Sequence, residues 1–284
     1  MTATILDGRA LARTMRGEIK EQVAAFVDAN GWAPGIAVVQ VGEDPSSSWY
    51  VRQIKKTFAR AGMDFALHTL PADSEANALT GLLAELNGDA RTNGVIVQMP
   101  LPKHLPQSLV TDTLDAAKDV DGIHPISAGR LMQQSGDCFA PATPAGGMEI
   151  LKRYAIDLKG KKAVMVGRSN IVGRPMALLM LHQHATVTVC HSRTVDLPSV
   201  TREADILVAA IGRAKVITAD MIKPGAVVID FGVNVMGDGI QGDVDTEATM
   251  EVAGAITPVP GGTGPMTNVM LMLNTLTAAQ RQQA

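Results

Sequence analysis

The second half of the chain contains the stretch Ala163-Val164-Met165-Val166-Gly167-Arg168-Ser169-Asn170-Ile171-Val172-Gly173-Arg174-Pro175. An apolar run that ends at Gly167 and helical periodicity from about Gly173 predict a buried strand, a tight turn and a helix. Pro175 fits the first turn of that helix. The free amides and positive dipole end of a helix start favour an anion such as a phosphate. Because the spacing is Gly-x5-Gly and not Gly-x-Gly-x-x-Gly, a plain strand-to-helix turn remains the alternative.

Short apolar runs alternate with helical periodicity on both sides of this stretch. Further strands are expected at 186–190, 206–210 and 226–231. In the first half, the sequence predicts strands at 36–41, 65–70 and 94–98, and helices near 8–29, 46–61 and 74–88. This alternation predicts parallel strands joined by right-handed crossovers, with helices on both faces. We therefore expect an α/β fold with a Rossmann-like second half and a mainly parallel sheet.

Composition agrees with this fold class. At 284 residues the chain is about two domains long, on a prior of roughly 150 residues per domain. It is 46% hydrophobic but only 3% aromatic, and its 15 Met add to an aliphatic core that suits α/β layers better than a β-sandwich. Pro and Gly are frequent between residues 99 and 147, so loops and short helices are expected there, at a junction between two lobes.

Charge and hydropathy exclude several classes of protein. A net charge of -3 and a pI near 6.1 give no general attraction to phosphate backbones, so nucleic acid is not an expected partner. No apolar run approaches the roughly 18 residues that cross a bilayer, and the start lacks a basic and then an apolar segment. We expect no membrane association and a cytoplasmic protein. Cys138, Cys190 and the histidines show no disulfide or metal spacing, so no metal is expected.

The end of the strand at 186–190 indicates which dinucleotide would bind. An NAD site usually offers an Asp or Glu about 20 residues after the glycine turn, whereas this strand ends in Cys190-His191-Ser192-Arg193. Charge-assisted hydrogen bonds to a 2′-phosphate could come from Arg168, Ser169, Ser192 and Arg193. The sequence therefore favours NADP over NAD. The alternative is that Arg193 is a solvated surface charge.

Several stretches in order along nearly the whole chain point to one protein family. They are Val41-Gly42-Glu43-Asp44-Pro45-Ser46 with Tyr50-Val51, residues 94–102, Lys118-Asp119-Val120-Asp121-Gly122-Ile123-His124-Pro125, Thr143-Pro144, residues 167–175, and residues 257–267 with the run Pro-Val-Pro-Gly-Gly-Thr-Gly-Pro-Met-Thr. Together they resemble the methylenetetrahydrofolate dehydrogenase/methenyltetrahydrofolate cyclohydrolase family. The resemblance implies hydride transfer from 5,10-methylenetetrahydrofolate to NADP, commonly followed by hydrolysis of the methenyl product to 10-formyltetrahydrofolate.

The resemblance also implies a domain organisation. Two α/β lobes would enclose the active site in the cleft between them, usually in a homodimer. A folate-binding lobe would contain residues 1–140 and the C-terminal helix, residues 266–284, and an NADP-binding lobe would contain residues 141–265. Besides the polar residues named above, the cofactor would contact Gly167, Ile171, Gly173 and Val233.

Three side chains match family positions that meet folate. A carboxylate such as Asp121 can accept two hydrogen bonds from the 2-amino-4-oxo edge of a pterin. Tyr50 could stack on the folate, and Gln98, at a strand end, would lie beside the reacting carbon. Without the resemblance they would be an Asx-turn residue, a packing residue and an exposed glutamine. Backbone amides of Pro260-Gly261-Gly262 would approach folate and nicotinamide closely.

One position departs from the family pattern, Tyr-Val-x-x-Lys-x-Lys, whose first lysine is most closely tied to the cyclohydrolase step. Here the run is Tyr50-Val51-Arg52-Gln53-Ile54-Lys55-Lys56. On a helix, Ile54 is rotated about 40° from Tyr50 around the helix axis, whereas Lys55 and Lys56 are rotated about 140° and 240° from Tyr50. Isoleucine can neither donate nor accept a proton, so Ile54 predicts a dehydrogenase with little or no cyclohydrolase activity.

Two other hypotheses stay open. A bifunctional enzyme could use Gln53, or a lysine from a remodelled helix, in place of the missing group. A third possibility is a folate- and NADP-binding protein without catalysis. The intact Gln98, Asp121 and glycine-rich segments argue against it, since a non-catalytic binder need not keep both halves of a ternary site. The predicted catalytic positions are therefore Tyr50, Gln98, Asp121 and the altered Ile54.

Overall fold

The computed structural model describes residues 2–42, 45–237 and 239–283, and these form two compact units. The first unit contains the chain up to Arg13 together with Thr143–Thr267, and the second contains Thr14–Ala142 and the chain from Asn268 on. From the sequence, residues 1–140 are expected in one lobe. The start of the chain joins the other unit instead, because strand β1, Thr4–Ile5, pairs in parallel with β11, Ala255–Ile256.

The described part of the first unit is built on a six-stranded sheet whose neighbouring strands are all parallel, in the order β1-β11-β8-β7-β5-β6. Its other strands are β5 (Lys162–Val166), β6 (Thr186–Cys190), β7 (Ile206–Ala209) and β8 (Val227–Asp230). These four strands confirm the predicted apolar runs. The chain passes from β5 to β6 on one side and returns to β7 on the other. In such sheets ligands bind where the strand order reverses, at the carboxyl ends.

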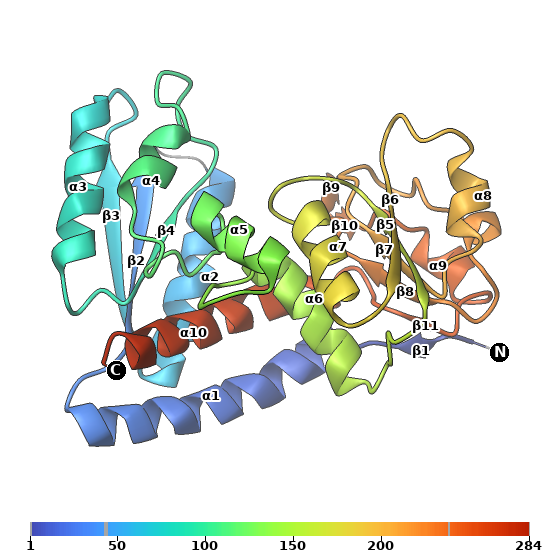
Figure 1. Cartoon of the computed structure of the whole chain (residues 1–284), viewed down its shortest axis with the longest axis horizontal. Helices are drawn as coiled ribbons and strands as arrows, with labels where there is room; N and C mark the ends of the chain where they lie inside the picture. The colour runs from blue at the N-terminus through green and yellow to red at the C-terminus, as the bar shows by residue number, and fades with distance from the viewer. Residues whose placement is uncertain (1, 43–44, 238, 284) are drawn as a thin grey trace. The chain divides into compact units, whose positions relative to one another are not determined.

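Helices cover both faces of this sheet (Figure 1). On one side lie α6 (Ala142–Arg153) and α7 (Gly173–His182), and on the other lie α8 (Leu197–Thr201) and α9 (Thr246–Thr249). The 3-10 helix η1 (Ala219–Met221) contributes Met221 to the core cluster beside α8. The second side packs Leu197 and Val200 against buried strand residues such as Leu207 and Val228. The first expected helix of this half, near 173–184, is confirmed, although it ends at His182.

An antiparallel hairpin follows β8, and the sequence analysis did not predict it. Its strands are β9 (Asn234–Met236) and β10 (Gly239–Gln241), with Asn234 opposite Gln241. Strands this short carry too few residues for an alternating pattern to be visible.

The described part of the second unit contains a three-stranded parallel sheet in the order β3-β2-β4. The central strand β2 (Gly35–Val41) and β4 (Gly94–Val97) are buried throughout, whereas the edge strand β3 (Asp64–Leu70) is exposed or half-buried. Its helices are most of α1 (Gly8–Asn30), α2 (Pro45–Ala61), α3 (Ala76–Gly88), α4 (Ser108–Thr113), α5 (Pro125–Gln133) and most of α10 (Gly264–Arg281), and the first residues of α1 and α10 belong to the first unit. The strands and the first three helices agree with the sequence prediction to within two residues.

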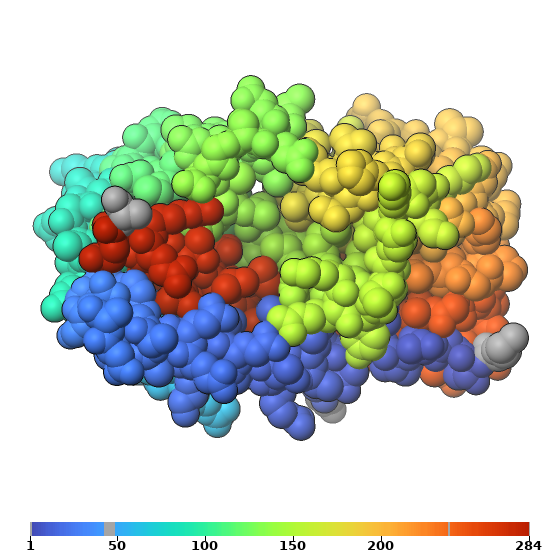
Figure 2. All heavy atoms as spheres, turned by 60° about the horizontal axis from the view of Figure 1, so that its bottom comes forward, coloured from blue at the N-terminus to red at the C-terminus, as the bar shows by residue number. Residues whose placement is uncertain are grey.

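Within this unit, α1 and α10 lie side by side (Figures 1 and 2). The buried residues Met15, Ile19, Val23 and Phe26 recur at helical spacing along α1 and give it one apolar face. No helix in the described part of the chain is both long enough and apolar enough to cross a membrane.

Candidate active site

Two glycines shape the turn between β5 and α7. Gly167 has φ = +134°, and a Cβ there would overlap the carbonyl oxygen of Ala210, which follows β7. A Cβ on Gly173 would overlap the carbonyl oxygen of Gly167. The backbone can approach itself this closely only without side chains. A bare backbone at a helix start is the cradle that a pyrophosphate requires, so these residues fit a dinucleotide.

Polar side chains surround this turn. The hydroxyl oxygen of Ser169 accepts hydrogen bonds from the backbone N–H groups of Val172 and Gly173, both at 3.2 Å. The side chains of Arg168 and Arg193 are exposed, and within the described chain neither forms a salt bridge. Both guanidinium groups are therefore available to an anion.

The structure brings the predicted cofactor residues to one edge of the sheet. Gly167, Arg168, Ser169, Ile171 and Gly173 follow β5, Ser192 and Arg193 follow β6, and Val233 follows β8. Carboxyl ends of parallel strands meet at a single edge. Ile171 and Val233 are exposed there, where apolar side chains can contact a ring.

Two buried carboxylates that the sequence analysis missed hold the neighbouring loops. Asp243 accepts hydrogen bonds from the backbone N–H groups of residues 211–213, directly beyond β7. Asp230, the last residue of β8, accepts from the N–H groups of Gly232 at 2.7 Å and Asp243 at 3.1 Å. Burial raises the pKa of Asp230 to about 6, and the charge of Asp243 adds to this rise.

The Pro- and Gly-rich segment at residues 258–265 lies against the start of α1. The N–H of Arg9 donates to the carbonyl oxygen of Gly261 at 3.0 Å, and a Cβ on Gly8 would overlap the carbonyl oxygen of Gly262. Gly261 has φ = +116°, which favours glycine. Pro260 and both glycines therefore belong to the first unit, whereas Tyr50, Gln98 and Asp121 belong to the second.

In the second unit, a buried carboxylate organises the loop that carries Asp121. Asp119 forms a parallel bridge with Val95 of β4, so Asp121 lies near the carboxyl end of that strand. The Asp119 carboxylate accepts hydrogen bonds from the N–H groups of Ile123 at 3.2 Å and His124 at 2.8 Å. Burial raises the pKa of Asp119, and these hydrogen bonds oppose the rise. Asp119 is part of the sequence motif around Asp121, but the motif alone indicates no role for it.

Tyr50 and Asp121 lie close enough to interact electrostatically. Burial raises the pKa of the Tyr50 phenol, and the charge of Asp121 raises it further. Burial raises the pKa of Asp121 to about 6, and the charge of Asp119 contributes to the rise. Among the described residues, no lysine or arginine offsets these shifts. The site therefore gathers two carboxyl groups and a protonated phenol.

Gln98 follows β4, and its side chain is buried rather than exposed. Its backbone N–H donates to the carbonyl oxygen of Val39 at 2.8 Å. Lys118, close to Asp121 in sequence, directs its ammonium elsewhere. It donates to the carbonyl oxygens of Leu86 at 2.8 Å and Asp89 at 2.7 Å, at the end of α3.

Ile54 lies on α2, one turn after Tyr50, and its side chain is 0% exposed. The neighbouring Lys55 and Lys56 are both exposed. The helix is unbroken around these positions, and the hydroxyl of Thr57 donates to the carbonyl oxygen of Gln53 at 2.7 Å on the same helix. The buried face of α2 therefore carries an aliphatic side chain at the position where the sequence resemblance implies a lysine.

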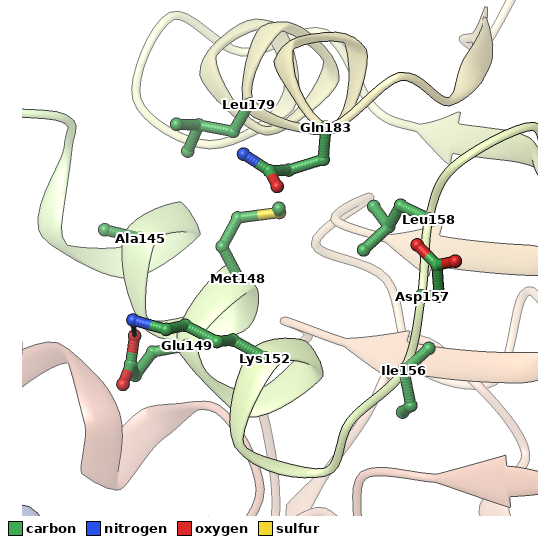
Figure 3. A pocket seen from close by; sticks show the side chains of 9 residues that line it. All are labelled: Ala145, Met148, Glu149, Lys152, Ile156, Asp157, Leu158, Leu179 and Gln183. Carbon is green, nitrogen blue, oxygen red and sulfur yellow. Dashed lines mark ion pairs between the residues drawn. The ribbon is translucent and has the colours of Figure 1, made fainter.

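A cavity of about 460 Å³ opens in the first unit between α6 and α7 (Figure 3). Met148, Leu158 and Leu179 line it, and Glu149 and Lys152 form an ion pair beside it at 3.8 Å. None of the predicted site residues lines this cavity, so it is separate from the candidate site.

Comparison with known families identifies the chain. A model described as tetrahydrofolate dehydrogenase/cyclohydrolase, catalytic domain, matches residues 6–121, and one described as the NAD(P)-binding domain of the same enzymes matches residues 141–283. The chain belongs to this family. The resemblance drawn from the sequence motifs is confirmed, as are the α/β fold, the Rossmann-like unit and the enzyme class.

Relatives match the chain over its whole length. The bifunctional protein FolD of Roseiflexus sp. (strain RS-1) is 53% identical over 285 residues, covering 100% of this chain and 99% of the relative. The crystal structure of bifunctional FolD from Campylobacter jejuni has a TM-score of 0.96 and 42% identity, covering 98% of this chain and 99% of that one. FolD from Trypanosoma brucei, complexed with NADP and an inhibitor, has a TM-score of 0.95 and 34% identity, covering 99% and 98%.

The raised pKa of Asp121 generates a prediction. Because the folded chain holds this proton more tightly than the unfolded chain, Asp121 makes folding less favourable as the pH rises from about 4 to about 6. We expect Asp119→Asn to lower the pKa of Asp121, since a negative charge is removed while burial remains. A carbon NMR titration of the aspartate carboxyl groups, assigned with Asp121→Asn, measures the shift. An unchanged titration in Asp119→Asn would contradict the coupling.

Proposed function

We propose that this chain oxidises 5,10-methylenetetrahydrofolate to 5,10-methenyltetrahydrofolate with NADP, and that its cyclohydrolase activity is weak or absent. Family membership supports the dehydrogenase activity. The loss of the second activity rests on one observation. Ile54 is fully buried one turn from Tyr50, where the family pattern has a lysine.

Tyr50, Gln98 and Asp121 bind the folate in this proposal. The Asp121 carboxylate accepts two hydrogen bonds from the 2-amino-4-oxo edge of the pterin. The Tyr50 ring stacks on the substrate, and its protonated hydroxyl, whose pKa burial raises further, serves as a hydrogen-bond donor. Gln98, at the carboxyl end of β4, lies beside the reacting carbon. Together these contacts fix the methylene carbon for hydride transfer.

The first unit holds the cofactor. Bound NADP supplies the nicotinamide that accepts a hydride. The turn between Gly167 and Gly173 carries the pyrophosphate, and Ile171, Val233 and the Pro260–Gly262 backbone contact the rest of the molecule. Arg168, Ser169, Ser192 and Arg193 bind the 2′-phosphate. Hydride transfer depends mainly on positioning and asks for no proton transfer from position 54, so Ile54 leaves it intact.

The cyclohydrolase step requires a proton-transferring group in addition to positioning. Adding water to the methenyl carbon requires proton transfers by a positioned group. Lys55 and Lys56 are exposed, and Lys118 donates to carbonyl oxygens at the end of α3. The bifunctional alternative needs Gln53 or a remodelled helix, but α2 is regular with Ile54 on its buried face. The non-catalytic alternative leaves unexplained why both units keep their predicted binding residues.

Paired assays test this proposal. We expect the purified chain to reduce NADP with methylenetetrahydrofolate. We expect its hydrolysis of methenyltetrahydrofolate to be slower than that of a chain with the lysine by about 100-fold or more, the lower range of general acid–base catalysis. We expect Ile54→Lys to gain hydrolysis and Ile54→Met, which keeps the position apolar, to gain none. Wild-type hydrolysis well above the spontaneous rate would overturn the loss of cyclohydrolase, and no NADP reduction would overturn the dehydrogenase.

The choice of cofactor gives a second test. We expect Arg193→Ser to raise the KM for NADP about tenfold to a hundredfold, since hydrogen bonds to charged groups contribute about 1.5–3 kcal/mol. The KM for NAD, which lacks the 2′-phosphate, should stay unchanged. Arg202→Ser serves as the matched control, because Arg202 is exposed after α8 in the same unit. Equal losses with both cofactors would argue against a contact to the 2′-phosphate.

We further propose that the chain forms a homodimer through the β9–β10 hairpin. Its apolar side chains are strongly exposed in a single chain, with Val235 at 76%, Met236 at 54% and Ile240 at 43%. Apolar side chains gathered on one exposed element are typical of an interface.

Light scattering of the purified protein tests the dimer. We expect Val235→Lys to give monomers, because a lysine charge opposes burial in an apolar interface. Met132→Lys changes a residue of similar exposure in the other unit and should leave the mass of the dimer unchanged. A monomeric wild type would refute the dimer, and a dimeric Val235→Lys would refute the hairpin as its interface.

A further inference from the structure

Asn274 is a polar residue of α10 that directly follows the apolar run at residues 269–273, and Leu271, Met272 and Leu276 near it are buried. Its side-chain Nδ2 donates to the carbonyl oxygen of Val120 at 2.8 Å and lies 3.5 Å from the carbonyl oxygen of Ala140. Val120 directly precedes Asp121. The C-terminal helix therefore holds the peptide that carries the Asp121 carboxylate.

The same turn is fixed from two other directions. From the residues that follow the turn, the Asp119 carboxylate accepts hydrogen bonds from the N–H groups of Ile123 and His124 and from the hydroxyl of Ser127. Gly122 has φ = +69°, and a Cβ there would lie 2.6 Å from the carbonyl oxygen of Phe139. The Asn274 amide lies near both the Asp121 turn, at the Val120 carbonyl, and the segment that Gly122 packs against, at the Ala140 carbonyl. Asn274 therefore links this turn to that segment.

The C-terminal helix has a second anchor of the same kind. The side-chain amide of Gln282 donates to the carbonyl oxygen of Asn93 at 3.0 Å, and Asn93 donates back at 2.9 Å. This pair lies before β4, at the end of the strand opposite to Gln98. The Gln282 amide also lies 3.5 Å from the carbonyl oxygen of Ala117, whereas the hydrogen bond to the Val120 carbonyl comes from Asn274, so Gln282 serves as the control.

We propose that Asn274 is a positioning residue that orients the Asp121 carboxylate for two hydrogen bonds to the pterin. This inference rests on the proposed function, in which Asp121 holds the folate. A carboxylate that accepts two parallel hydrogen bonds must keep its place within about 0.5 Å and 10–20°. Loss of the Asn274 hydrogen bond frees the Val120 peptide to rotate, and the carboxylate moves with it.

Steady-state kinetics of Asn274→Leu, which keeps the size of the side chain but removes the donor, test the inference. We expect the KM for methylenetetrahydrofolate to rise about tenfold, since a hydrogen bond to a carbonyl oxygen that orients a charged group contributes on the order of 1.4 kcal/mol. The KM for NADP should stay unchanged. A merely structural role would lower the active fraction, and hence kcat, and leave both KM values alone.

Two comparisons complete the experiment. Gln282→Leu should leave the KM for folate unchanged, and Asn274→Gln should recover part of the loss because it retains an amide donor. In an Asp121→Ala background, Asn274→Leu should add little, because both changes act through one carboxylate. If Asn274→Leu does not fold, Asn274→Ala replaces it in the same comparisons.

The outcomes separate this inference from the proposed function. If the wild-type chain oxidises no methylenetetrahydrofolate, or if Asp121→Ala leaves the KM for folate unchanged, the proposed function or its assignment of Asp121 fails. If the wild-type chain is active and Asp121→Ala raises the KM for folate, an unchanged KM for folate in Asn274→Leu overturns the role of Asn274. Full additivity of Asn274→Leu with Asp121→Ala overturns it as well.

Discussion

Buried aspartates that accept hydrogen bonds from backbone amides hold the loops on which both units depend. Removing a carboxylate from water is costly unless donors replace the lost hydration. Asp119 meets this cost with the N–H groups of Ile123 and His124, and Asp243 meets it with those of residues 211–213. The burial of each carboxylate and the shape of its loop therefore stabilise each other. Because the loop backbone is held in place, the side chains on these loops have fixed positions as well.

Much of the fold could be predicted from the sequence because its strands are long apolar runs. The strands near 36–41 and 163–166 and the helix that begins at Gly173 are local patterns, and the structure has them within two residues. Strands β1 and β11 could not be predicted, since each has only two residues and exists only through its partner. Their pairing depends on contacts between distant parts of the chain, which no local pattern records.

The candidate site divides in the same way. Tyr50 and Asp121 could be named from motifs, and the electrostatic coupling between them shows that they lie together. The supporting groups were not named, because Asn274 meets Val120 only through the fold. One signal was available, since Asn274 is a polar residue that directly follows the apolar helical run at residues 269–273. Asp119 stands two residues before Asp121 in the quoted motif, but its role depends on how the next eight residues turn back to bring three donors to its carboxylate.

The path of the chain ties the two units together in time as well as in structure. The chain passes between the units three times, after Arg13, Ala142 and Thr267. During synthesis the segment of β1 leaves the ribosome early, but the partner of Thr4 is Ala255, which is made late. The strands of the three-stranded sheet can pair long before that. The edge of the six-stranded sheet must stay open until nearly the whole chain exists, so translation completes the smaller sheet first and the larger one last.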